Sequence, residues 1–319
     1  MTHHYRIAGL TVASELKLPG ARVAEAVESS DVSIRLAPVP ETLGGASTTA
    51  QFWEADATRL LFKARGVARF LLLDGGQVDV ELEPGGVLSD VAAYLQGSVF
   101  GALLHQRGAL VMHASAVAVG EGAVLFCGPS GHGKSTTAAT LGERGYPMLG
   151  DDVCAIVFDG DGVPMARADA RQYKLAANAI DVLELSERKG AAVVHNQTKF
   201  YVEPSGSAVA RDLPVLAVYI IKKIGPDEET AIRSLTPAEA VGALTRNAYR
   251  PSMIRQLGLS PKYFVGCVKI ADKAKIFSLA PRRDLLFLAD TAARLEAHWR
   301  QVGLIGLAGD RPSAHGAQL

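Results

Sequence analysis

The chain has 319 residues, of which 48% are hydrophobic and 21% charged, a balance typical of a globular protein with ample material for a core. Its 33 basic and 33 acidic side chains cancel, so no net field favours nucleic acid or an anionic membrane, and we expect neither as a partner. No signal-like or membrane-spanning apolar run is present, and three scattered cysteines are too few for a disulfide framework or a zinc site. We therefore expect a cytoplasmic protein with reduced cysteines in its core.

Residues 1–88 predict a small β-rich domain without candidate chemistry. Glycine- and proline-containing turns separate three expected strands, at residues 31–36, 59–63 and 77–82. Ser89 is expected to cap the helix that follows, because apolar residues recur there at a spacing close to the helical period. Gly108 is expected to end this helix.

Residues 89–305 predict an α/β domain, and residues 306–319 a flexible tail with no periodic pattern. A capping box at residues 236–239, with proline at the first helical position, predicts a helix that runs to about Asn247. An amphipathic helix is expected at residues 283–299. The expected strands are 110–119, 123–127, 152–158, 215–222 and 269–279.

A glycine-rich loop follows the strand at 123–127 and matches the pattern G-x-x-x-x-G-K-[ST] in full. Glycines allow backbone N–H groups to form an anion nest, and the helix after the loop directs its positive end at the phosphates. Lys134 would bridge the β- and γ-phosphates of ATP or another nucleoside triphosphate, and the Ser135 hydroxyl would complete the Mg²⁺ shell. A turn that binds nothing is disfavoured by the strand–loop–helix context. The residues expected at the nucleotide are Gly128, Pro129, Ser130, Gly131, His132, Gly133, Lys134, Ser135 and Thr136.

An acid pair, Asp151-Asp152, follows one helix and one short strand after the loop. We expect that strand, residues 146–149, to lie beside the strand that leads into the loop and to bring the carboxylates to the γ-phosphate. Because adjacent side chains at a strand end point opposite ways, one acid would hold Mg²⁺ and the other would accept the proton of an attacking hydroxyl. A solvated turn or a helix cap is the alternative interpretation.

His113 lies among small and apolar residues in the expected strand 110–119. A lone histidine in such a strand is more often a hydrogen-bonded core residue than a catalyst. Its strand should nevertheless pair as a hairpin with the strand that enters the loop, which would bring the imidazole near the phosphates. His132, inside the loop, is expected to point to solvent.

Taken together, these residues resemble the C-terminal kinase domain of HPr kinase/phosphorylase, whose nucleotide site is akin to that of PEP carboxykinase. The resemblance covers roughly residues 108–160 and implies an α/β, PEP carboxykinase/HPr kinase-like P-loop kinase core that uses ATP and Mg²⁺. It implies active-site roles for His113 and Lys134, and Asp152 as the general base. Asp151 is then the carboxylate beside it, expected with Ser135 at the metal.

The resemblance also has departures that bear on the reaction. Residues 171–177 contain no acid where the family has a Mg²⁺-binding glutamate, so the reverse phosphorylase reaction is not expected. The whole chain is more similar to HPr-kinase-like proteins encoded with peptide-tailoring enzymes, some of which are lasso-peptide kinases that phosphorylate a C-terminal serine of the precursor.

We therefore expect a serine acceptor on a peptide or small protein, the lasso-precursor serine being favoured. An HPr-type phosphocarrier serine, a small-metabolite acceptor and a nucleotide-binding switch that transfers nothing stay open as alternatives, as does a homo-oligomer. Further residues that could contact phosphate or acceptor are Arg171, Lys199, Arg246, Asn247 and Arg250.

Overall fold

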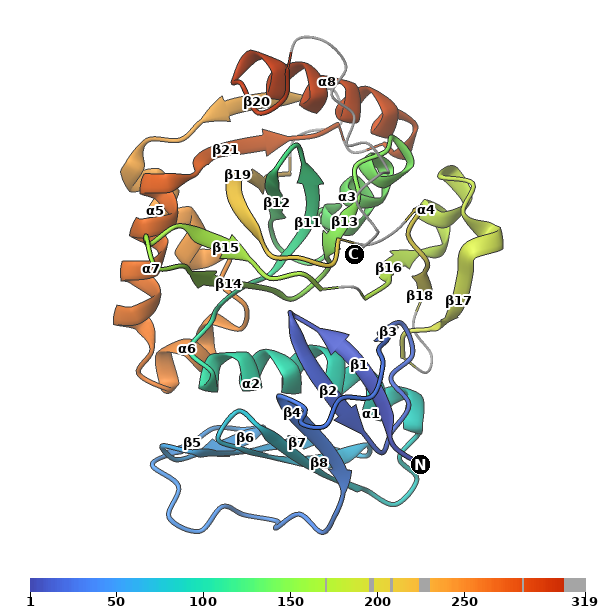
Figure 1. The fold of residues 1–319 in the computed structure, drawn as a ribbon, viewed down its shortest axis with the longest axis vertical. Helices are drawn as coiled ribbons and strands as arrows, with labels where there is room; N and C mark the ends of the chain where they lie inside the picture. Colours follow the sequence, from blue (N-terminus) through green and yellow to red (C-terminus); the bar gives the residue numbers. More distant parts are fainter. Residues whose placement is uncertain (170, 195–197, 207–208, 224–229, 283, 307–319) are drawn as a thin grey trace.

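A computed structural model describes residues 1–169, 171–194, 198–206, 209–223, 230–282 and 284–306. The architecture is mixed α/β, with one nine-stranded sheet in the first part of the chain, a second nine-stranded sheet in the rest, and a separate three-stranded sheet (Figure 1). Apart from residue 306, the predicted tail lies outside the described residues. Within the described ranges, no helix has both the length and the apolar character needed to cross a lipid bilayer.

The first sheet follows a period of two in burial, as expected for strands with one face on a core. In the strand Ala68–Leu73, for example, Ala68, Phe70 and Leu72 are buried, while the residues between them are partly exposed. The three strands predicted here are present as β4, β7 and β9. The strands are β1 (His3–Ile7), β2 (Leu10–Ser14), β3 (Arg22–Val23), β4 (Val32–Leu36), β5 (Thr48–Thr49), β6 (Trp53–Ala55), β7 (Arg59–Ala64), β8 (Ala68–Leu73) and β9 (Gln77–Leu82), in the spatial order β3-β1-β2-β4-β9-β8-β7-β6-β5.

A continuous helical run lies between the first sheet and the rest of the molecule (Figure 1). It consists of α1 (Leu88–Tyr94), a π-helical turn η1 (Leu95–Val99) and α2 (Phe100–Gln106), and Gly108 ends it at a φ of +81°. Ser89 is not the N-cap as predicted, because the helix already begins at Leu88 and no side chain caps it. The predicted boundary at residue 88 thus falls at the start of a helix whose apolar residues belong to the same hydrophobic cluster as the first sheet.

The second sheet carries the predicted hairpin at its centre. Its strands are β10 (Leu110–Met112), β11 (Ala114–Val119), β12 (Gly122–Cys127), β13 (Met148–Gly150), β14 (Cys154–Phe158), β15 (Pro164–Ala166), β19 (Leu213–Ile221), β20 (Ala231–Ser234) and β21 (Lys275–Ala280), in the order β10-β14-β15-β19-β12-β11-β13, with β21 and then β20 added beside β19. β11 pairs antiparallel with β12, while β12 is parallel to β19 and β19 to β21. The expected strand before the acid pair is β13, but it lies beside β11 and not beside β12, so that prediction was wrong. β11 occupies the place next to β12 instead, because only a tight turn separates these two strands in the sequence, whereas α3 lies between β12 and β13.

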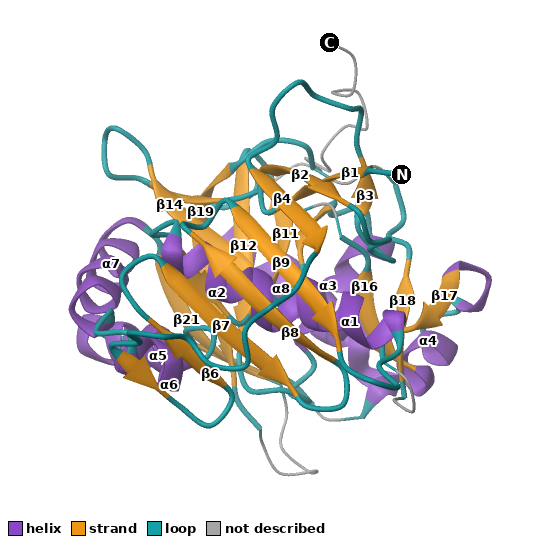
Figure 2. Ribbon diagram, turned by 90° about the horizontal axis from the view of Figure 1, so that it is seen from below, coloured by secondary structure: helices purple, strands orange, loops and turns teal. Residues whose placement is uncertain are grey.

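Helices cover both faces of the second sheet. α3 (Lys134–Glu143) and α8 (Leu288–Gln301) share one hydrophobic cluster, and α5 (Pro237–Arg246) and α7 (Ser260–Lys273) share another; Figure 2 shows α5, α7 and the short α6 (Pro251–Gln256) gathered at one side. The capping box before α5 is confirmed. The predicted strand 269–279 is wrong in its first half, where α7 continues to Lys273, and only the remainder forms β21. The amphipathic helix near the end is present as a short η3 (Leu285–Phe287) followed by α8.

The small third sheet stands beside α3 and supplies one wall of the candidate site. Its strands are β16 (Tyr173–Ala176), β17 (Lys189–Ala192) and β18 (Lys199–Val202), in the order β16-β18-β17, accompanied by α4 (Ala177–Val182) and η2 (Ser186–Arg188). None of these strands was predicted. The three cysteines are free and buried, as expected.

Candidate functional site

The glycine-rich loop connects the buried strand β12 directly to α3. Gly131 and Gly133 have left-handed backbone conformations, with φ of 76° and 90°. A Cβ at either position would meet nothing within 4 Å, so the backbone conformation, and not lack of space, calls for glycine. No side chain caps α3, and the first N–H groups of an uncapped helix suit an anion.

Lys134, the first residue of α3, folds back over the loop. Its ammonium group donates hydrogen bonds to the carbonyl oxygens of Gly128 at 2.8 Å and Pro129 at 3.1 Å, and to Nε2 of His113 at 2.9 Å. The side chain is buried, and burial lowers its pKa, although the two acids of the pair act in the opposite direction. Lys134 is therefore held between the loop and the histidine.

His113 lies at the break between β10 and β11, where its backbone N–H donates to the carbonyl of Asn247 at 2.9 Å. Its Nδ1 lies 3.1 Å from the backbone oxygen of Asp152 and 3.3 Å from that residue's Oδ1. An ammonium group can only donate, so Nε2 must accept from Lys134 and Nδ1 carries the proton directed at Asp152. The imidazole thus links the loop lysine to the acid pair, and the prediction that the hairpin brings His113 near the loop is confirmed.

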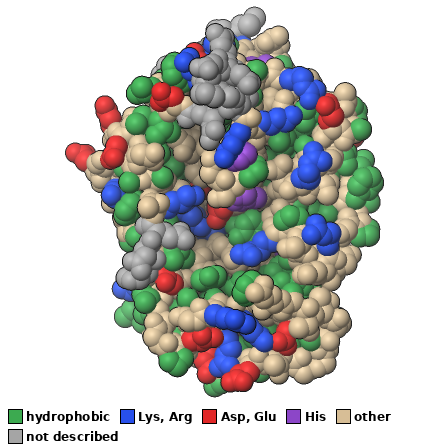
Figure 3. Space-filling view, turned by 180° about the vertical axis from the view of Figure 1, so that it is seen from behind, with side chains coloured by type: hydrophobic (Ala, Val, Ile, Leu, Met, Phe, Trp, Pro, Cys, Tyr) green, Lys and Arg blue, Asp and Glu red, His purple; other side chains and the backbone are tan. Residues whose placement is uncertain are grey.

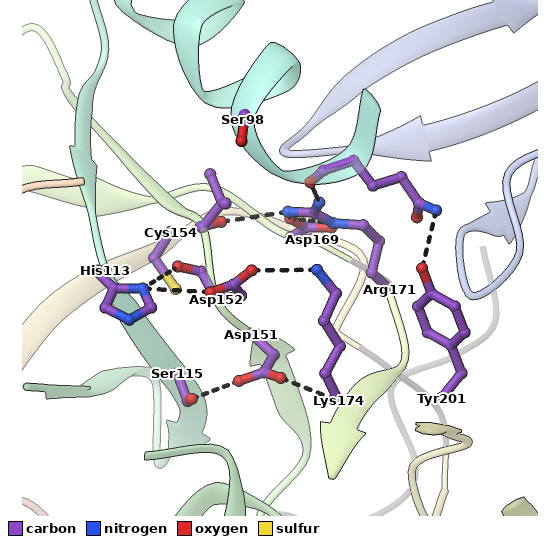
Figure 4. Close-up of polar contacts among 12 residues, drawn as sticks. Ser98, His113, Ser115, Asp151, Asp152, Cys154, Asp169, Arg171, Lys174 and Tyr201 are labelled. Atoms are coloured by element: carbon purple, nitrogen blue, oxygen red, sulfur yellow. Dashed lines mark hydrogen bonds and ion pairs between the residues drawn. The ribbon is translucent and has the colours of Figure 1, made fainter. Parts of the chain in front are cut away.

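The two acids point in opposite directions, as the sequence predicted (Figure 4). Asp151 is buried, and its carboxylate oxygens accept hydrogen bonds from Ser115 Oγ and from the backbone N–H of Lys174. Asp152 lines a cavity instead, with a φ of 72° that a non-glycine residue rarely adopts. Such strain is found mainly where the surroundings fix a residue for function.

Lys174, on β16, is a site residue that sequence reasoning missed. Its Nζ lies 3.1 Å from Oδ2 of Asp152, and its side chain is only 12% exposed (Figure 4). Burial by itself would raise the pKa of Asp152, but Lys174 and His113 outweigh it and hold that pKa well below its ordinary value. A single lysine between the apolar Tyr173 and Leu175 was the available sequence signal.

The loop, Asp152 and Lys174 open on one cavity of about 310 Å³. Figure 3 shows Lys and Arg side chains gathered near the middle of this face, with histidine and acidic side chains between them. This excess of positive charge suits a polyanion such as a triphosphate. The basic residues that line the cavity are Lys134, Lys174, Lys199, Lys222, Lys223 and Arg282, and the acidic ones are Asp152 and Asp284.

A second cavity of about 390 Å³ adjoins the first. It is lined by Gly128 and Pro129 of the loop and, opposite them, by residues 246–251. His113 and Asp152 line both cavities, so they stand at the junction between the two spaces.

The other sequence candidates fall into different places. Lys199 lines the first cavity, whereas Arg246, Asn247 and Arg250 line the second. His132 is half-buried against the first cavity and does not simply point to solvent as predicted.

Arg171 was wrongly predicted to reach phosphate or acceptor. It is 3% exposed and forms an ion pair with the equally buried Asp169. It also donates to the carbonyl oxygens of Gln96 and Val153. These contacts use the guanidinium group inside the protein, so Arg171 supports the site from behind.

The donor set fits Mg²⁺ only together with nucleotide phosphates. Among the described residues, no group of three His, Cys, Asp or Glu side chains could hold a metal ion. Mg²⁺ is commonly bound by one or two protein oxygens plus substrate phosphates, and Ser135 and Asp152 both line the first cavity. Asp151, predicted as a metal ligand, is 2% exposed and lines neither cavity; its carboxylate points to Ser115 and the Lys174 amide and would have to turn toward the first cavity to reach the metal.

Comparison with known proteins adds a loose structural likeness. The chain is similar to the Hpr(Ser) kinase/phosphatase from Coxiella burnetii over 60% of its own length and 98% of that chain, with 12% sequence identity and a TM-score of 0.29. At these values the likeness carries no argument about activity. No family model and no curated protein matches the sequence.

Proposed function

We propose that the protein is a nucleoside triphosphate- and Mg²⁺-dependent kinase that transfers the γ-phosphoryl group to a serine hydroxyl of a peptide or small protein. The observation that carries this proposal is that His113 and Asp152 line both cavities. A nucleotide held by the loop on one side and an acceptor on the other would meet at these two side chains.

The residues around the junction suit both reacting groups, the acceptor hydroxyl and the transferred phosphoryl group. The acceptor hydroxyl oxygen would form a bond to the γ-phosphorus as the bond to the β-phosphate oxygen breaks, releasing the nucleoside diphosphate. Asp152, ionised because of its low pKa, would accept the hydroxyl proton and pass it to solvent. Lys134 and the loop amides would stabilise the charge that develops on the phosphoryl oxygens.

Mg²⁺, held by the phosphates and Ser135, would supply further neutralisation of the phosphate charge. Lys134 would exchange its contacts with the Gly128 and Pro129 carbonyls for phosphate oxygens. His113, which accepts a hydrogen bond from Lys134 and donates one to Asp152, would fix the positions of the lysine and the base relative to each other.

The acceptor favoured first is a serine at the C-terminus of a lasso-peptide precursor, on the resemblance noted from the sequence. An HPr-type phosphocarrier is the second acceptor of this class, on the same resemblance. Both would present a serine hydroxyl to Asp152.

Mass spectrometry of acceptors incubated with the protein, ATP and Mg²⁺ tests the proposal. We expect a gain of one phosphate on a serine-ended precursor peptide or on an HPr-type carrier. Lys134→Ala and Asp152→Asn should each lower the transfer rate by at least about 100-fold, and Asp152→Asn should leave ATP binding largely intact. Asp272→Asn, at the end of α7 and away from both cavities, is the matched control. Full transfer by Asp152→Asn would contradict the assignment of the base, and ATP binding without any transfer would favour a switch or a metabolite kinase.

A further inference from the structure

The wall of the second cavity formed by residues 246–251 is joined to His113 by main-chain hydrogen bonds. The segment after α5 pairs with the end of β10: the N–H of Tyr249 donates to the carbonyl of Val111 at 2.7 Å, and the N–H of His113 donates to the carbonyl of Asn247 at 2.9 Å. Met112 and Ala248 form the bridge between these two bonds. The main chain therefore fixes the position of this wall relative to the junction.

Two arginines flank this paired segment. Arg246 ends α5 and Arg250 precedes α6; both are exposed, and both line the cavity. Arg246 makes no hydrogen bond or ion pair with any described residue. Arg250 donates to Ser98 Oγ, and its guanidinium carbon lies 5.8 Å from the ring centroid of Tyr249. Neither guanidinium is neutralised by an acid of the cavity, because Asp152, the acid that lines it, is already paired with Lys174.

The backbone of this cavity also carries unusual strain. Of the five described non-glycine residues with positive φ, two line it: Arg250, at 51°, and Asp152, at 72°. Left-handed backbone at such residues is strained and persists where the surroundings impose it. The strained conformation places Arg250 on the rim of the cavity that Asp152 also lines.

We propose that the second cavity binds the acceptor through an anionic group, a carboxylate or a phosphate, that the acceptor carries within a few bonds of its reacting hydroxyl. This inference rests on the proposed function and specifies its substrate class. Guanidinium groups bind such oxyanions bidentately, and two of them in one small cavity select an anion over a neutral group. The anion would be held on the rim by Arg246 and Arg250, with the hydroxyl directed inward at Asp152.

A competing role for the arginines is to contact the γ-phosphate from the far side. The two roles differ in which ligand loses affinity when a charge is removed. Binding is therefore measured with the phosphate loop already filled, by titrating inorganic phosphate into the protein saturated with Mg²⁺ and a non-hydrolysable ATP analogue.

We expect Arg246→Gln and Arg250→Gln each to weaken phosphate binding at least about tenfold, as expected when a charge-assisted hydrogen bond is lost. Arg255→Gln, an exposed arginine of α6 outside the cavity, should leave it unchanged. Unchanged phosphate binding in Arg246→Gln and Arg250→Gln, or a loss of affinity for the ATP analogue alone, would overturn the proposal. Because no transfer is needed, this result does not depend on whether the protein is a kinase.

Transfer then identifies the source of the anion. The acceptors are a tripeptide that ends in serine with a free carboxylate, the same peptide as its C-terminal amide, and the hydroxy acid glycerate. We expect a KM for the free-carboxylate peptide at least about tenfold below that of the amide, and expect Arg246→Gln to remove this difference while the KM for ATP stays the same. Preference for glycerate would assign the anion to a small hydroxy acid. Equal KM values for acid and amide, with glycerate unused, would contradict the proposal.

Discussion

Asp152 combines features that rarely occur together in a side chain with only a structural role. Its backbone is left-handed, its carboxylate contacts both a lysine and a histidine, and it lines two cavities at once. A low pKa keeps it ionised and able to accept a proton across the neutral range, although a weaker base gives less driving force for proton transfer. In a transfer with a loose transition state, positioning of the hydroxyl matters more than basicity.

Lys174 sets the pH range in which Asp152 can act. Its positive charge lowers the pKa of Asp152, so Lys174→Gln should raise that pKa toward the ordinary carboxyl value. Since only the ionised carboxylate accepts a proton, the acidic limb of the pH–rate profile should move to higher pH in this variant. The measurement is kcat against pH at saturating nucleotide and acceptor.

Lys199→Gln is the matched control for that profile, because Lys199 lines the same cavity without an ion pair to Asp152. The acidic limb of the Lys199→Gln profile should lie at the same pH as that of the unsubstituted protein. An equal shift of the acidic limb in both variants would mean that the summed positive charge of the cavity sets the pKa of Asp152, and would contradict a specific role for Lys174.

At the residue scale, the sequence predicted what lies close together along the chain. The loop, His113 and the acid pair occupy one compact stretch around a hairpin and a helix, so spacing alone could bring them together. Lys174 comes from a different sheet, and its contact with Asp152 depends on how that sheet packs beside α3. The same lack of tertiary information led to the wrong prediction for Arg171, whose burial cannot be inferred from a polar stretch.

At the scale of elements, the buried guanidinium group of Arg171 links the starts of β14 and β16 behind the site. Arg171, just before β16, forms an ion pair with Asp169 and donates to the carbonyl of Val153, the residue after Asp152. It also reaches the π-helical turn through the carbonyl of Gln96. Arg171 therefore joins three parts of the chain around Asp152.

Removing one partner of this pair should be far more damaging than removing both. Arg171→Met leaves Asp169 buried and unpaired, which is expected to lower the free energy of unfolding by about 3–5 kcal/mol, whereas Arg171→Met with Asp169→Leu should recover much of that loss. Urea denaturation measures both. The exposed pair Arg233–Glu239 is the control, and Arg233→Met should leave the free energy of unfolding nearly unchanged, because solvent screens this pair. Equal losses in the single and double variants would contradict this account.

Elements were predicted well where a local signal exists and poorly where packing decides. The capping box fixed the start of α5, and the loop fixed the start of α3. By contrast, residues 269–273 mix charged and apolar side chains without a clear period, yet they extend α7 because that helix buries Cys267 and Ile270 against the second sheet. The third sheet escaped prediction because its strands are short and only partly buried.

At the scale of the whole molecule, the β-rich first part and the nucleotide-loop part share a core. One hydrophobic cluster contains Ile34 and Phe70 of the first sheet, Phe100 of α2, and Val111 and Tyr249 next to the candidate site. Burial of apolar surface is the main stabilising contribution, so neither part retains its full core without the other. The residues that carry the candidate chemistry are thus supported by a sheet none of whose strands lines either of the two cavities.

This shared core predicts that the two parts unfold in one transition. The chain has two tryptophans, and each part holds one: Trp53 in β6 and Trp299 in α8, both buried. With 5-fluorotryptophan incorporated, each gives its own ¹⁹F resonance, so a single urea titration follows both parts in one sample. We expect the two native resonances to disappear with the same midpoint, coincident with the loss of far-ultraviolet circular dichroism, as cooperative unfolding requires. Separate midpoints would mean that the cluster around Tyr249 does not couple the parts, and that the second sheet holds the nucleotide loop and His113 without help from the first.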